Sequence, residues 1–146
     1  MNATDAAVER FKGGFNCAQS VLAAFAPDLG LPEAVALKLA VPFGGGMGHT
    51  RGACGAVSGA VMALGLRFGS NVAGDKEGKE RAYTIARRFI EEFRARNNGV
   101  LCPELLGCDI ATPEGYAAAK EKQLFTTLCP KLVRSAAEIV SAMLAT

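Results

Sequence analysis

The residues in this sequence best suited to chemistry are its five cysteines, Cys17, Cys54, Cys102, Cys108 and Cys129. Cysteine thiolates act as nucleophiles, as redox groups and as ligands for soft metals. No two of these cysteines have CxxC spacing, and neither a CxxCH motif nor a compact zinc pattern is present. Any site that they share must therefore be assembled by the tertiary fold from separate segments of the chain.

Three of the cysteines fall at the predicted starts of helices. Cys17 follows Asn16, a good N-cap residue, and Gln19 three positions after Asn16 completes a capping-box pattern. Cys102 and Cys129 each precede a proline, which is favoured in the first turn of a helix. The N-terminus of a helix favours a thiolate, because the positive end of the helix dipole lowers the pKa of the thiol.

Cys54 lies where a glycine-rich loop is predicted to become the central helix. The glycines at 44, 45, 46 and 48 cannot form a helix interior cheaply, so we expect positive φ or close backbone contact there. From Ala53 to Phe68 the apolar residues follow helical spacing. A stripe of small residues, Gly55, Gly59 and Ala63, would let a second backbone approach closely.

The other polar residues near these cysteines allow two interpretations. His49, the single histidine, and Arg51 flank Cys54 in sequence and could supply positive charge that lowers its pKa. A role in solvent exposure or loop hydrogen bonding fits both residues equally well. Cys108 follows Gly107 at the end of a short turn, and we interpret it as accessory.

Apolar periodicity predicts an all-α fold: a single domain over residues 1–146, formed by six or seven helices with the glycine-rich loop before the central helix. No segment alternates as a strand would. Besides the helix that starts near Ala53, helices are predicted over residues 5–12, 17–26, 33–41, 79–96, 113–124 and 130–144. Residues 69–78, which are polar and contain glycine, are expected to form a surface connection.

Composition narrows the function classes. Sixteen basic residues against 14 acidic ones give a net charge of +2, which provides no case for binding nucleic acid or an anionic membrane. No apolar run reaches the roughly 18–20 residues that span a bilayer, and the charged N-terminal segment does not resemble a signal peptide. We therefore predict a cytoplasmic protein, in which a disulfide framework is not expected. The nucleotide motifs GxGxxG and GxxxxGK[ST] are absent.

At the cysteines, the sequence resembles the C_GCAxxG_C_C family of redox-active proteins, small bacterial and archaeal proteins named for their cysteine pattern. Cys17 lies in FNCAQSVL, Cys54 begins CGAVSG, Cys102 begins CPELLG and Cys129 begins CPKLV. The resemblance implies a helical fold and a redox role for these four cysteines. A related arrangement occurs in split-Soret cytochromes, which bind haem through CxxCH motifs. This sequence has none, so the resemblance implies no covalent haem but allows a cysteine-ligated iron–sulfur cluster or another thiolate-bound metal.

Three functions remain open at this point. In the first, which we favour, Cys54 is a reactive thiolate resolved by Cys17, Cys102 or Cys129, and the redox partner protein or small substrate is unknown. In the second, the same four cysteines ligate a metal or an iron–sulfur cluster. In the third, the cysteines are structural, and the small-residue stripe serves helix packing or a homodimer interface. The candidate binding residues for a small substrate or cofactor beside Cys54 are Gly44, Gly45, Gly46, Gly48 and Gly55.

Overall fold

The computed structural model describes residues 1–146, and its regular secondary structure is helical throughout. Seven helices have eight residues or more: α1 (Ala3–Lys12), α2 (Cys17–Phe25), α3 (Glu33–Ala40), α5 (Gly55–Phe68), α6 (Lys76–Asn97), α8 (Pro113–Glu121) and α10 (Cys129–Leu144). The short helices are α4 (Gly44–Met47), α7 (Cys102–Leu106), α9 (Leu124–Thr127) and the 3₁₀ turns η1 (Pro27–Leu29) and η2 (Val41–Phe43). The all-α prediction is confirmed. No helix combines the length and apolar character needed to cross a membrane.

Four predicted boundaries need correction. Helix α1 begins at Ala3 rather than at residue 5, and α8 ends at Glu121 rather than at residue 124. The central helix begins at Gly55 rather than Ala53, with Cys54 as its N-cap residue. Helix α6 begins at Lys76, inside the segment expected to be a surface connection, because the Asp75 carboxylate accepts a hydrogen bond from the Gly78 backbone N–H at 2.9 Å. This cap offsets the low helix propensity of Gly78.

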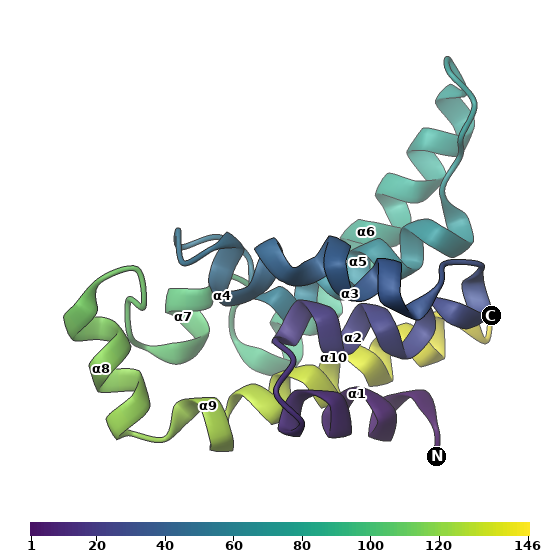
Figure 1. Ribbon diagram of the computed structural model, residues 1–146. Helices are drawn as coiled ribbons and strands as arrows, with labels where there is room; N and C mark the ends of the chain where they lie inside the picture. The colour runs from purple at the N-terminus through teal and green to yellow at the C-terminus, as the bar shows by residue number, and fades with distance from the viewer.

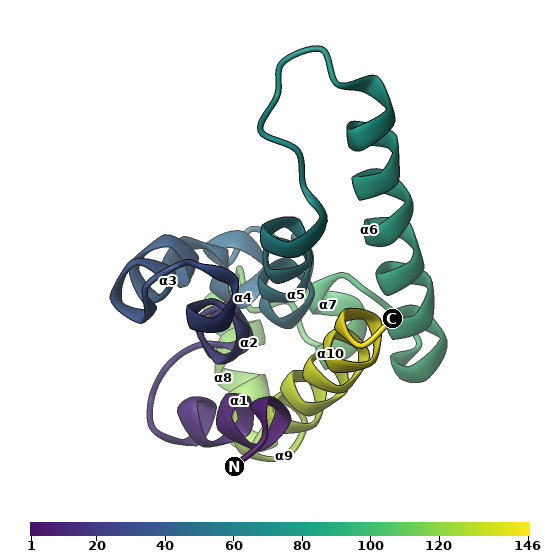
Figure 2. The same ribbon diagram turned by 90° about the vertical axis from the view of Figure 1, so that its right-hand side faces the viewer.

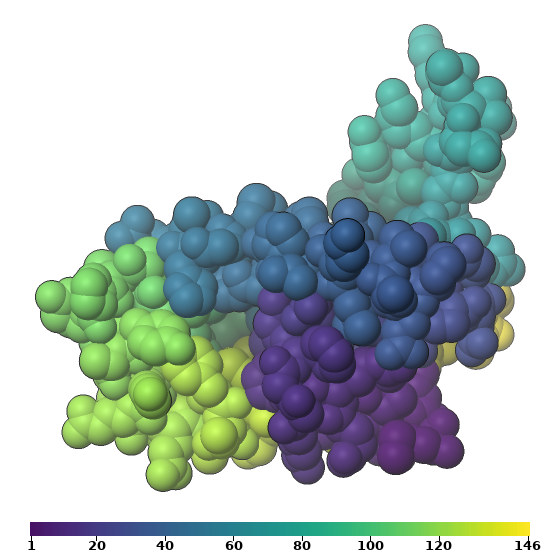
Figure 3. Space-filling view, viewed as in Figure 1, coloured from purple at the N-terminus to yellow at the C-terminus, as the bar shows by residue number.

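The bundle has two distinct ends (Figure 1). At one end, the starts of α2, α5 and α10 lie close to α8 and to the short helices α4, α7 and α9. At the other end, α6 extends beyond the rest of the molecule. Figures 2 and 3 show its N-terminal half rising with the preceding loop as an arm, while its C-terminal half returns to the bundle. Phe89 and Phe93, in the C-terminal half, are fully buried and stacked at 5.9 Å between ring centroids.

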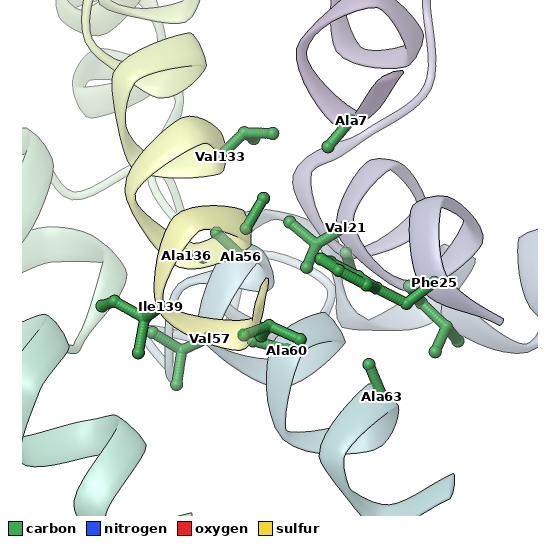
Figure 4. Packing of buried hydrophobic residues seen from close by; sticks show 14 of the residues in the cluster. Ala7, Val21, Phe25, Ala56, Val57, Ala60, Ala63, Val133, Ala136 and Ile139 are labelled. Atoms are coloured by element: carbon green, nitrogen blue, oxygen red, sulfur yellow. The ribbon is translucent and has the colours of Figure 1, made fainter. Parts of the chain in front are cut away.

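The core is formed chiefly by α2, α5 and α10, with α1 packed along the outer side of α2 and α10. Most of the side chains that fill it are small or medium-sized and apolar, so the helix axes can lie close together. The residues labelled in Figure 4 belong to this core: Ala7, Val21, Phe25, Ala56, Val57, Ala60, Ala63, Val133, Ala136 and Ile139.

A close backbone contact joins α5 to the first turn of α2. A Cβ atom placed on Gly59 would lie 2.6 Å from the Ala18 carbonyl oxygen, and one placed on Gly55 would lie 3.0 Å from the Ala18 nitrogen. The small-residue stripe predicted from the sequence is therefore used for helix packing within the chain. It also brings Cys17, which precedes Ala18, next to the residue that follows Cys54.

We predict that alanine will have opposite effects at two glycines of α5. Gly59→Ala should lower the free energy of unfolding by about 1–3 kcal/mol, since its Cβ overlaps the α2 backbone. Gly65→Ala, whose Cβ meets no atom within 4 Å, should raise that free energy by up to about 1 kcal/mol through helix propensity. Urea denaturation of both variants measures the difference, and a neutral or stabilising Gly59→Ala would contradict the close contact.

Candidate functional site

Four of the cysteines line one cavity at the end of the bundle where α4 and α7–α9 gather. Each lies at a helix start: Cys17, Cys102 and Cys129 are the first residues of α2, α7 and α10, and Cys54 caps α5. The cavity has a volume of about 260 Å³. Its lining comprises Phe11, Gly14, Phe15, Asn16, Cys17, Gly45, His49, Cys54, Gly55, Cys102, Leu105, Leu106, Ile110, Tyr116, Phe125, Cys129 and Leu132. All five cysteines of the chain are free thiols in this structure.

Cys108 does not line this cavity. It is half-buried and packs against the small apolar cluster that contains Cys102 and Cys129. The structure thus brings together the four cysteines that were matched to the family pattern and leaves Cys108 outside them.

The start of α2 is fixed by the predicted capping box. Asn16 Oδ1 accepts a hydrogen bond from the Gln19 backbone N–H at 2.9 Å, and Gln19 Oε1 accepts one from the Asn16 backbone N–H at 3.0 Å. The amide groups of both side chains also donate across the fold, to the carbonyls of Val41 and Leu37, at 3.0 Å each. These four bonds hold the backbone on either side of Cys17 and thereby fix the position of its thiol.

Cys54 and Cys102 are placed by a short antiparallel pairing. The Cys54 N–H donates to the Val100 carbonyl at 2.8 Å, and the Cys102 N–H donates to the Gly52 carbonyl at 2.9 Å, on either side of a bridge between Ala53 and Leu101. Two segments nearly fifty residues apart are thereby held in register. Hydrogen bonds from backbone N–H groups of residues 100 and 101 to the Glu104 carboxylate hold the second segment and lower the pKa of Glu104.

The glycine-rich loop before Cys54 forms one turn of left-handed helix. Residues 45–49 all have φ between 63° and 74°. The N–H groups of residues 48, 49 and 50 donate to carbonyls four positions earlier, at 2.9, 3.1 and 3.2 Å. Left-handed conformation costs about 1–2 kcal/mol at a non-glycine residue, here Met47 and His49, and much less at glycine. The glycines therefore lower the energetic cost of this turn. The expectation of positive φ is confirmed for Gly45, Gly46 and Gly48.

The candidate binding glycines do not all line the cavity. Gly45 and Gly55 line the cavity, whereas Gly44 and Gly48 line a shallow hollow beside Asn16 and His49. Gly46 is buried, and a Cβ on it would lie 2.8 Å from the Cys102 Cβ.

The thiol of Cys17 lies at the centre of the cysteine cluster. It is hydrogen-bonded to Cys129 and to Cys54, and these bonds, together with burial, raise the pKa of Cys17 well above its ordinary value. The same bond lowers the pKa of Cys54, and the backbone amides of Ala56 and Val57 lower it further. The bond from Cys17 likewise lowers the pKa of Cys129. One protonated thiol therefore serves two sulfurs that favour the thiolate form.

Cys102 behaves differently, because burial raises its pKa to about 12, with smaller contributions from the negative charges of Cys54, Cys129 and Asp109. The expectation that a helix start lowers the pKa of a thiol is confirmed for Cys54, where the backbone amides of Ala56 and Val57 contribute. It is wrong for Cys17 and Cys102, and the lowered pKa of Cys129 is caused by Cys17 rather than by the helix start. In an apolar cavity, burial and neighbouring thiolates outweigh the dipole of a helix N-terminus.

His49 and Arg51 do not account for the lowered pKa of Cys54. Arg51 forms an exposed ion pair with Asp109 at 2.7 Å, which lowers the pKa of Asp109. His49 lies at the cavity mouth, where its ring is 5.7 Å from that of Tyr116. The exposed interpretation therefore fits both residues, and His49 in addition lines the cavity.

The aromatic wall of the cavity was not predicted from the sequence. Tyr116 on α8 and Phe125 on α9 lie 5.3 Å apart between ring centroids and continue the row from His49, and Phe11 and Phe15 also line the cavity. Tyr116 belongs to a helix with little apolar periodicity. Its aromatic side chain is therefore the only signal in the sequence that could have identified it as a cavity residue.

No group of three or more histidine, cysteine, aspartate or glutamate side chains has an arrangement that could hold a metal ion. The cysteine sulfurs donate to and accept from one another instead. The metal-centre interpretation gains no support from this geometry and stays a prediction.

Comparison with known proteins places the chain in a family. A model of the family described as "Putative redox-active protein (C_GCAxxG_C_C)" matches residues 15–143, and the protein belongs to that family. The match includes all four cysteines that line the cavity. No curated protein and no solved structure matches the chain.

We predict that Gly46→Ala will destabilise the protein more than Gly74→Ala. Both glycines have positive φ, at 74° and 79°, but a Cβ at Gly74 meets no atom within 4 Å. Gly74→Ala therefore reports conformational strain alone, whereas Gly46→Ala adds overlap with Cys102. We expect an additional loss of at least about 1 kcal/mol from the free energy of unfolding, measured with urea. Equal losses would mean that the turn does not press against Cys102.

We also predict that Cys17→Ala will slow alkylation of Cys54 at neutral pH. Iodoacetamide reacts with the thiolate, and the lowered pKa of Cys54 keeps that form present until the pH falls below this pKa. Without the bond from Cys17, the pKa rises, so the rate profile should move to higher pH. Peptide-level mass spectrometry measures the rate, with Cys108→Ala as the control that leaves it unchanged. An unshifted profile in Cys17→Ala would refute the role of the bond.

Proposed function

We propose that this protein is a thiol-based redox protein in which Cys54 is the attacking thiolate and Cys17 is the resolving thiol. The observation that carries the proposal is that Cys17 and Cys54 line one cavity, at a contact so close that a Cβ atom on Gly55 would lie 3.2 Å from the Cys17 Cβ. The lowered pKa of Cys54, caused first by Cys17, agrees with this placement. Buried structural cysteines have no need of such a pairing, because they behave as small apolar residues.

In the proposed reaction, the Cys54 sulfur forms a bond to the oxidised substrate. The Cys17 sulfur then attacks Cys54, and a disulfide forms as the reduced substrate leaves with two electrons. Cys17 must first lose its proton, and the Cys129 thiolate, which already accepts a hydrogen bond from it, is the base within reach. Cys102 keeps its proton, since its pKa is about 12, and acts as part of the cavity wall.

The metal-centre function is the second candidate, because the four cysteines that would act as ligands line the same cavity. We further propose a cytoplasmic location, where a dithiol returns to its reduced form, and assembly as a homodimer.

We predict that diamide will close one disulfide per chain, between Cys17 and Cys54. The test uses anaerobically purified protein, with metal content measured first and free thiols counted before and after oxidation. Peptide mapping should locate the bond, and dithiothreitol should restore all five thiols. Cys17→Ser and Cys54→Ser should abolish the disulfide, whereas Cys108→Ser should retain it.

Two other outcomes would overturn this proposal. Stoichiometric zinc, or iron with sulfide, that is lost in Cys54→Ser would establish the metal-centre function instead. Five free thiols that persist through oxidation, without metal, would leave only a structural role for the cysteines.

A further inference from the structure

We propose that the cavity admits a small, uncharged quinone of one or two rings as the two-electron acceptor for the Cys17–Cys54 dithiol. This inference rests on the function proposed above and adds the class of its substrate. Three features of the cavity carry it: a wall without basic or acidic side chains, its aromatic surface and the depth of the Cys54 sulfur.

The cavity wall contains no lysine, arginine, aspartate or glutamate. Arg51 and Asp109, which do not line the cavity, neutralise each other in an ion pair. An anionic acceptor would lose its hydration on entry without gaining a partner of opposite charge. Cys54, which favours the thiolate, would in addition repel it. The cavity therefore disfavours anionic acceptors, and a quinone, which is uncharged, meets this condition.

The wall presents aromatic faces to whatever enters. The rings of His49, Tyr116 and Phe125 form a row with centroid separations of 5.7 and 5.3 Å, and Phe11 and Phe15 contribute further aromatic surface. Aromatic rings prefer to stack or tilt against other rings. The cavity volume of about 260 Å³ is slightly below the range of about 300–1,000 Å³ that holds drug-sized ligands. Both properties fit a flat molecule of one or two rings.

The attacking sulfur lies too deep for direct contact with a folded partner protein. Cys54 is 5% exposed, whereas Cys17, the resolving thiol, is only partly buried. A small molecule reaches the Cys54 sulfur through the cavity. The imidazole of His49 and the hydroxyl of Tyr116 provide polar groups for the quinone oxygens at the mouth.

The electrons and protons of the redox step balance between the three cysteines Cys17, Cys54 and Cys129, the quinone and solvent. The Cys54 thiolate adds to the quinone, and Cys17, after passing its proton to Cys129, attacks the Cys54 sulfur. The Cys54–quinone bond breaks, the Cys17–Cys54 bond forms, and the electron pair leaves on the hydroquinone oxygens. Two protons from solvent complete the hydroquinone. The dithiol is thus oxidised by two electrons, and the quinone is reduced by two.

The test uses anaerobically reduced, full-length protein and duroquinone, whose methylated ring carbons block permanent addition of a thiol. We expect one hydroquinone per chain, a mass loss of two hydrogen atoms and a Cys17–Cys54 disulfide in the peptide map. The rate should saturate with duroquinone. Glutathione disulfide, which is anionic, should react at least about tenfold more slowly.

The two tyrosines of the chain provide a matched pair of variants. Tyr116→Ala removes a ring from the cavity wall and should raise the half-saturating duroquinone concentration by about tenfold. Tyr83→Ala removes an equally exposed ring on α6, outside the cavity, and should leave that concentration unchanged. Tyr116→Lys keeps the mouth occupied but adds a cation, so it should favour glutathione disulfide over duroquinone. Circular dichroism confirms that each variant is folded.

Several results would overturn the quinone proposal. It fails if glutathione disulfide or the neutral hydroxyethyl disulfide reacts faster than duroquinone, or if the two tyrosine variants behave alike. It also fails if diamide closes the Cys17–Cys54 disulfide and duroquinone does not, an outcome that leaves the thiol redox function intact. If neither reagent closes the disulfide, the proposed function itself is wrong.

Discussion

The close contact between α2 and α5 is the constraint on which the rest of the structure depends. Gly55 and Gly59 let the α2 backbone approach until no space remains for a Cβ atom. Because Cys17 begins α2 and Cys54 caps α5, this contact also sets the separation of their thiols. The glycines of the CGAVSG segment therefore serve the site through packing, and their spacing of four residues is that of one helix face.

The energetics of the cavity follow from placing several thiols where water is scarce. Each thiolate gains from the amides of a helix start, but it loses hydration and repels its neighbours. The structure resolves this conflict by keeping protons on Cys17 and Cys102 and by favouring negative charge on Cys54 and Cys129. Similar positions at helix starts thus lead to different protonation. Sequence position alone does not determine the chemistry of these cysteines.

The sequence predicted the helices and the four clustered cysteines because both leave local signals. The Asn16–Gln19 capping box and the Cys-Pro starts of α7 and α10 are such signals. The aromatic wall and the pairing of Gly52–Cys54 with Val100–Cys102 were missed, because both arise from contacts between distant segments. The left-handed turn is an intermediate case: its glycines predicted positive φ, whereas its hydrogen bonds depend on five consecutive residues, two of which are not glycine.

The hydrogen bonds of Cys17 also link electron transfer to proton transfer in the proposed reaction. Once Cys17 joins Cys54 in a disulfide, it can no longer donate to Cys129, and the largest cause that lowers the pKa of Cys129 is lost. Loss of the Cys54 charge acts in the opposite sense, but it is the smaller contribution. Cys129 should therefore keep the proton that it takes from Cys17. On reduction, the same proton is available to return to Cys17, so the three sulfurs would form a proton store inside an otherwise apolar cavity.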